Sequence, residues 1–69
     1  MSDMLNKLKD SLPWGAQAEV ARSFGVTPSA VSQILSGAIQ NDDILFALIH
    51  KAKEYKKKLG RIKKEMENL

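Results

Sequence analysis

The sequence contains no cysteine and only one histidine among its 69 residues. The absence of cysteine excludes both a disulfide framework and a thiolate metal site, and it favours a reducing compartment, so we expect a cytoplasmic protein. The single histidine, His50, has no cysteine or second histidine to complete a set of ligands, which argues against a metal site. We therefore expect neither a metal nor any other cofactor.

Long apolar runs and catalytic motifs are also missing. No segment approaches the roughly 18 apolar residues that a membrane span needs, and the opening MSDMLNKLKD lacks the apolar stretch of a signal peptide. No nucleophile, base and orienting acid stand in a recognisable arrangement, and the length leaves little room for a cleft. We expect a protein that is not an enzyme, does not contact a membrane and, having no ligand domain, takes no small-molecule effector.

Helical periodicity is present over most of the chain, which predicts one small all-α domain. The stripe of a first helix is formed by Met4, Leu5, Leu8 and Leu12. Pro13 ends this helix, because the residue before a proline avoids the α region. Trp14 and Gly15 form the connector that follows, and Trp14 is predicted to plug the end of the core.

The most informative pattern is the run AEVARSFGVTPSAVSQILSG at residues 18–37, which predicts helices over residues 16–24 and 28–36. Gly25 supplies the positive φ of a tight turn between them. Thr27 can cap the second helix, Pro28 suits its first position, and Gly37 ends it. The inward residues are Val20, Ala21 and Phe24 on the first helix, and Val31, Ile34 and Leu35 on the second.

The outward residues of the second helix share short hydroxyl or amide side chains. They are Ser29, Ser32, Gln33 and Ser36. Such a face suits base edges better than it suits a core. The spacing is that of a helix-turn-helix and predicts a reader of double-stranded DNA.

A long helical pattern follows the linker at residues 38–41. Asn41 caps it, and Asp42 and Asp43 lie in its first turn, where the helix dipole favours negative charge. The residues Leu48, Ala52, Tyr55, Leu59, Ile62, Met66 and Leu69 are spaced alternately by four and three. This heptad seam predicts a homodimer. We divide the chain into a headpiece, residues 1–52, and a C-terminal helical extension, residues 53–69.

Some features of the long helix leave its geometry open. The seam is flanked by Lys51, Lys56, Lys58 and Lys63. These lysines repel one another across a parallel pair, which an antiparallel pair or a broader bundle relieves in part. Gly60 costs up to about 1 kcal/mol inside a helix and permits a bend that folds the last nine residues back. Phe46 lies off the stripe and fits either the core beneath the first helix or a dimer surface.

The net charge of +3 lies entirely in residues 42–69, where eight lysines and arginines face five acidic residues. Residues 1–15 and 16–41 each sum to zero. Attraction to phosphates scales with cationic contacts, so a single copy is expected to bind DNA weakly, and a second half-site multiplies the affinity. The basic run at residues 51–64 is read either as a solubilising helix face or as a contact with flanking DNA.

At these residues the chain resembles the lambda-repressor-like helix-turn-helix superfamily, the Cro and repressor (XRE-type) headpieces of phages and prophages. The resemblance rests on the spacing of Ala21, Gly25, Val31 and Ile34, flanked by TPSAVSQILSG. It covers residues 2–52. The chain is also similar to the LacI-type headpiece, although the helix before Trp14 favours the former family.

The resemblance implies a dimeric transcriptional regulator, usually a repressor, that reads an operator with two-fold symmetry. The implied base-reading residues are Thr27, Ser29, Ala30, Ser32 and Gln33, and the implied phosphate contacts are Ala16, Gln17, Ser36, Gln40 and Asn41. A glutamine amide pairs with adenine N6 and N7, and an alanine methyl suits the methyl group of thymine. Pro28 stands where the family commonly has a long polar residue, which implies one base contact fewer.

Two other functions fit parts of the same pattern. In the first, the helix-turn-helix is only a scaffold and the seam binds a different protein; the nearly neutral headpiece favours this reading. In the second, the lysine-rich tail coats DNA with low specificity. Salt-dependent binding to duplex DNA separates the first from a DNA reader, and removal of residues 53–69 tests the second.

Overall fold

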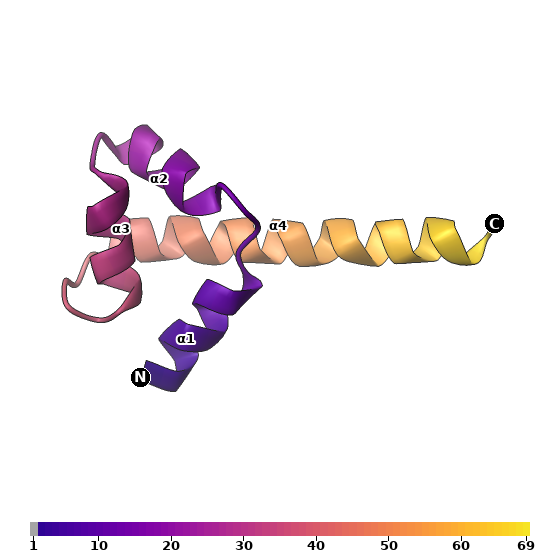
Figure 1. Ribbon diagram of the computed structural model, residues 1–69, viewed down its shortest axis with the longest axis horizontal. Helices are drawn as coiled ribbons and strands as arrows, with labels where there is room; N and C mark the ends of the chain where they lie inside the picture. Colours follow the sequence, from indigo (N-terminus) through magenta and orange to yellow (C-terminus); the bar gives the residue numbers. More distant parts are fainter. Residues whose placement is uncertain (1) are drawn as a thin grey trace.

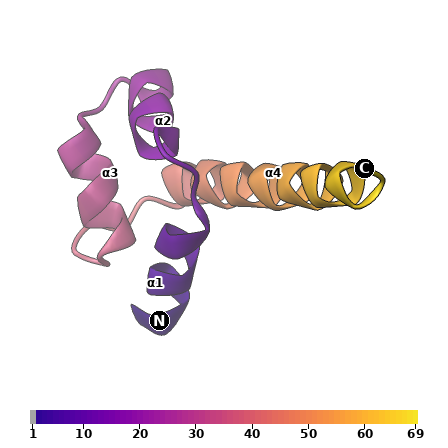
Figure 2. The same ribbon diagram turned by 45° about the vertical axis from the view of Figure 1, so that its right-hand side comes forward.

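The computed structural model describes residues 2–69, with side chains from residue 3 onward, and within them the fold is all-α with 78% helix and no strand. The helices are α1 (Ser2–Ser11), α2 (Ala16–Phe24), α3 (Pro28–Leu35) and α4 (Asp42–Glu67). The first three cluster around the beginning of α4, whose second half extends away from them (Figure 1). The view in Figure 2 shows the same arrangement. The predicted all-α class is confirmed.

Helix α1 ends at Ser11, before Pro13 as predicted. Leu8 and Leu12 are partly buried and pack against the core. Met4 is exposed, so its predicted place in the buried stripe is wrong. The reason is that Met4 lies near the outer end of α1, beyond the part of α4 that covers Leu8.

Trp14 does not plug the core: its side chain is fully exposed. The partly buried side chains that pack against the core cluster are instead Leu8, Leu12 and Ala47. The Trp14 indole therefore lies on the outside of the molecule, while Pro13 before it is half-buried.

The segment α2–turn–α3 has the predicted helix boundaries to within one residue. Gly25, at φ 67°, turns the chain, and the Val26 N–H donates to the Ala21 carbonyl at 2.9 Å. Val20 and Ala21 of α2 are buried in one cluster with residues of α3 and α4. The cluster members on α3 are Val31, Ile34 and Leu35. Phe24 is 43% exposed, contrary to its predicted inward place, because α2 ends there.

Helix α4 begins as predicted, with the Asn41 side chain accepting a hydrogen bond from the Ile44 N–H at 3.1 Å. Helical hydrogen bonding continues through Gly60 to Glu67. The alternative in which the chain bends at Gly60 and folds back is therefore wrong. Every residue from Lys56 to the end is exposed, since this half of α4 extends away from the cluster of the other three helices (Figure 1).

Two members of the predicted seam have other places in the structure. Leu48 is 0% exposed and lies in the core with Ile44. Its assignment to a dimer contact is wrong because α2 and α3 already cover it. Leu69 lies beyond the end of α4 at Glu67, so it does not continue the helical stripe. Phe46 is 71% exposed, which excludes the reading that it fills the core.

Candidate nucleic-acid interface

The outer face of α3 is formed by the polar residues that the sequence indicated. Ser29, Ser32 and Gln33 are exposed, and Ala30 is half-buried beside them. The opposite face of the same helix carries the fully enclosed Val31 and its aliphatic neighbours. The core therefore holds the backbone of α3 in place, while hydroxyl and amide groups point outward from it.

Hydroxyl groups at both ends of α3 make local hydrogen bonds. The Thr27 hydroxyl oxygen accepts a bond from the Ala30 N–H at 3.2 Å, so Thr27 caps the helix as predicted. The Ser36 hydroxyl donates to the Gln33 carbonyl at 2.9 Å. These two side chains fix the ends of the helix, which leaves Ser29, Ser32 and Gln33 as the freest polar groups on the face.

The N-terminus of α2 differs from the predicted phosphate site at one residue. The Ala16 N–H donates to the Pro13 carbonyl at 3.2 Å, and the Ala16 side chain is buried. Ala16 therefore cannot offer its N–H to a phosphate, which corrects that prediction. Within residues 2–69 the N–H groups of Gln17 and Ala18 have no backbone acceptor, so they take the place of Ala16 as candidate donors.

The remaining predicted phosphate contacts lie at the far end of α3 and just beyond it. Gln40 and Asn41 are both exposed. The amide oxygen of Asn41 is used in capping α4, so only its NH₂ group is free to bind an anion. Ser36, Gln40 and Asn41 follow one another along the chain from the end of α3 to the start of α4.

Charge is scarce on this side of the molecule. Helix α3 carries no charged residue, and α2 carries one of each sign, Glu19 and Arg22. Glu19 is 3.5 Å from the Lys51 ammonium group of α4, so Arg22 is left as the exposed cation of α2. The lysines of residues 56–64 lie on the projecting half of α4 (Figure 1).

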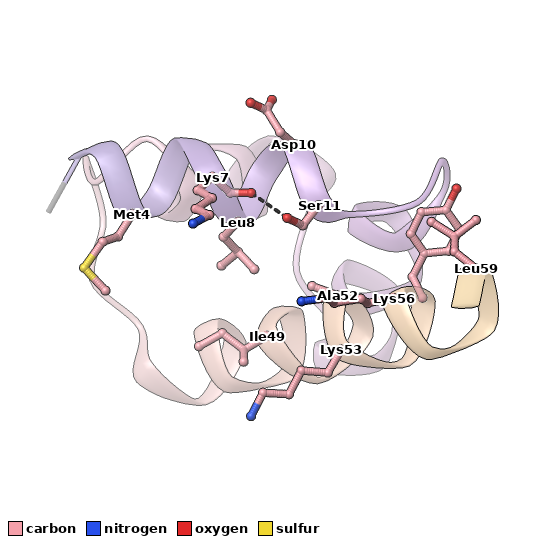
Figure 3. A pocket seen from close by; sticks show the side chains of 11 residues that line it. Met4, Lys7, Leu8, Asp10, Ser11, Ile49, Ala52, Lys53, Lys56 and Leu59 are labelled. Carbon is pink, nitrogen blue, oxygen red and sulfur yellow. Dashed lines mark hydrogen bonds between the residues drawn. The ribbon is translucent and has the colours of Figure 1, made fainter. Parts of the chain in front are cut away.

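The seam residues that follow Leu48 divide into two groups. Ala52 and Tyr55 are half-buried and, with Leu59, line a groove of about 560 Å³ between α1 and α4. Ile62 and Met66 are exposed beyond the groove. The structure therefore brings Leu8 of α1 together with the beginning of the seam (Figure 3).

Sequence periodicity missed this groove because it compares residues only within one helix. Its lining on the α1 side includes Met4 and Leu8, two members of the stripe that the spacing predicts for the first helix. Trp14 was also misplaced. A usable signal was its position between Pro13 and Gly15, since a short Pro-Trp-Gly connector gives the indole no helical stripe to join.

No protein-family model matches this chain, and neither a curated protein nor a solved structure is significantly similar to it. In the part of the chain that the structure describes, no group of three or more histidine, cysteine, aspartate or glutamate residues is placed to hold a metal ion. Among residues 2–69, none of the helices has both the length and the apolarity to cross a bilayer.

Proposed function

We propose that the protein is a sequence-specific DNA-binding transcriptional regulator that acts as a homodimer on an operator with two-fold symmetry, in the manner of a phage-type repressor. The observation that carries the proposal is the uncharged, hydrogen-bonding face of α3, held rigidly by the α2–turn–α3 core. In this account α2 and α3 are a helix-turn-helix, and α3 is the recognition helix that enters the major groove.

Each group on α3 has a role in the proposed complex. The Gln33 amide both donates and accepts, so it can pair with adenine N6 and N7 in one plane. Ser29 and Ser32 can bond to either kind of base edge, and the Ala30 methyl group can contact a thymine methyl. Thr27 lies at the end of α3 that enters the groove first, where its hydroxyl already caps the helix.

Backbone contacts position the recognition helix without reading sequence. The open N–H groups of Gln17 and Ala18 lie in the first turn of α2, at the positive end of the helix dipole, and suit a phosphate. Ser36, Gln40 and Asn41 provide neutral donors at the other end of α3. Because these groups include so few cations, one copy has low affinity for DNA. Two copies held together by α4 bind two half-sites, which raises the affinity.

A second function is supported by the same lack of charge. In this function the α2–turn–α3 unit only supports α4, whose apolar seam binds a different protein, so no cations are needed beside α3. The chain would then be a protein-interaction module that uses the α2–turn–α3 unit as a scaffold.

A salt titration of binding to a labelled random-sequence duplex separates these two functions. A DNA reader binds the duplex, and its affinity falls linearly on a log–log scale as salt rises, because counterions are released. The expected slope is shallow, since few cations face the groove. The matched control is a chain in which Ser29, Ser32 and Gln33 are all changed to Ala; it keeps the charge, so its affinity for this random duplex and its salt slope should stay close to those of the wild type. No binding at low salt contradicts the proposal and favours the protein-interaction module.

A further inference from the structure

The groove between α1 and α4 is an apolar surface that no segment of residues 3–69 covers. Its floor is formed by Leu8 of α1 and by Ile49, Ala52, Tyr55 and Leu59 of α4. In Figure 3 Leu8 points from α1 toward α4, and the Ser11 hydroxyl donates to the Lys7 carbonyl at 2.8 Å on the α1 side. Beyond the groove the same apolar stripe of α4 continues as the exposed Ile62 and Met66.

The geometry points to a second copy of this chain as the occupant, with the two α4 helices antiparallel and the C-terminal turns of each lying in the groove of the other. This inference rests on the homodimer of the proposed function and adds its orientation and its register. It also makes α1 part of the interface, which a seam confined to α4 does not.

The heptad spacing allows antiparallel registers that differ by seven residues. The groove favours the register that places both Ile62 and Met66 of the second copy against groove residues, because a shift by one heptad places Met66 opposite the buried Leu48 or beyond the groove. In an antiparallel pair of heptad helices, the two kinds of core position meet each other across the interface. Leu59 then packs against Ile62 of the second copy, and Tyr55 packs against Met66 of the second copy. By symmetry each contact occurs twice. Met66 of the second copy comes to lie beside Ala52, whose small side chain leaves room in the groove floor.

Charges on the two flanks of the stripe distinguish this orientation from the parallel one. Lys51, which pairs with Glu19 of α2, marks the α2 flank, and Lys58 and Glu65 follow it at heptad spacing. Lys56, which lines the groove, marks the α1 flank, and Lys63 follows it. In an antiparallel pair each flank meets the same flank of the other copy. In a parallel pair it meets the opposite flank.

The antiparallel orientation therefore pairs opposite charges. Lys58 meets Glu65 of the second copy on the α2 flank, and Lys53 at the groove rim meets Glu67 of the second copy. One like-charge pairing remains, between Lys56 and Lys63. The parallel orientation has only like-charge pairings across the seam, Lys51 with Lys56 and Lys58 with Lys63, and it leaves both grooves empty.

Reversal of the charge at Lys58 tests the orientation, because it should raise the dimer dissociation constant in one orientation and lower it in the other. In the antiparallel dimer Lys58→Glu places two carboxylates together at two symmetric sites, so the dimer dissociation constant rises about five- to tenfold. The double variant Lys58→Glu/Glu65→Lys restores the original value. In a parallel dimer Lys58→Glu faces Lys63 and lowers the dissociation constant. Lys57→Glu makes the same charge change on the outer side of α4 and is the matched control.

Sedimentation equilibrium without DNA measures these constants. A tighter Lys58→Glu dimer, or a wild-type chain that stays monomeric at every concentration, overturns the inference. Loss of DNA binding with the antiparallel dimer intact overturns the proposed DNA function alone.

Because the chain has no cysteine, disulfides provide a second readout that does not depend on dimer strength. An equimolar mixture of Leu59→Cys and Ile62→Cys chains is expected to form the mixed disulfide. Asn68→Cys chains are expected not to link to one another, since the two copies of that residue lie at opposite ends of the pair. Rapid linking of Asn68→Cys chains overturns the antiparallel arrangement.

Discussion

Serine and glutamine are short or flexible hydrogen-bonding residues, and their value on α3 depends on what fixes the backbone beneath them. Val31 and Leu35 are almost completely buried, and Thr27 caps the first turn. The side chains of Ser32 and Gln33 therefore extend from a stretch of backbone that the core already holds in place. This preorganisation reduces the entropy that binding must overcome.

The role of Gln33 in reading a base is tested by Gln33→Ala on a selected site and on a scrambled duplex. Loss of a bidentate pair with adenine should cost about 1–3 kcal/mol on the selected site and little on the scrambled one. Gln17→Ala is the matched control, because an amide that contacts phosphate should cost the same on both duplexes. Fluorescence anisotropy gives the six affinities, those of the wild type and the two variants on each duplex. Equal losses on both duplexes for Gln33→Ala would mean that Gln33 does not read a base.

At the scale of elements, local signals predicted helix boundaries well. The positive φ at Gly25, the Thr27 and Asn41 caps and Pro28 act within one turn of the chain, so they are readable from sequence. Burial was predicted less well because the burial of a residue depends on which other helix packs against it. Leu48, for example, has the sequence spacing of the seam, but in the structure it is buried in the core.

Helix α4 thus has two kinds of apolar residue, and a pair of variants on it distinguishes them. Leu48→Ala empties a fully buried site and should lower the free energy of unfolding by about 2–5 kcal/mol. Phe46→Ala removes a larger side chain that is 71% exposed, and its effect should stay within about 0.5 kcal/mol. Urea denaturation followed by circular dichroism measures both. If the two losses were equal, the core described above would be misassigned.

At the scale of the whole molecule, reading and assembly occupy different regions. The molecule is elongated, with extents of 45 × 26 × 16 Å, and the uncharged face of α3 lies near one end of α4 while most of the lysines lie toward the other (Figure 1). No pattern within one helix could have predicted the groove, because α1 and α4 are joined only by the fold. The candidate base-reading face, in contrast, is local to α3 and was predictable.

Disruption of the stripe beyond the groove should separate assembly from folding. Leu59→Asp places a charge among the apolar residues of the proposed interface and should give a monomer with the helix content of the wild type. Its affinity for a duplex with two half-sites should fall to that for a single half-site. Asn68→Asp adds the same charge outside the helix and should change neither property. Light scattering and anisotropy provide the readouts, and an unchanged molecular mass for Leu59→Asp would remove the dimer from the account.

The central claim, that α3 reads DNA sequence in a dimer, is tested most directly by selecting binding sites from a random duplex pool at two salt concentrations. We predict enrichment of one motif that occurs as two inverted half-sites, and we predict the same motif at both salt concentrations, because base contacts and not lysines choose it. The absence of any enriched motif at either salt concentration would contradict the claim.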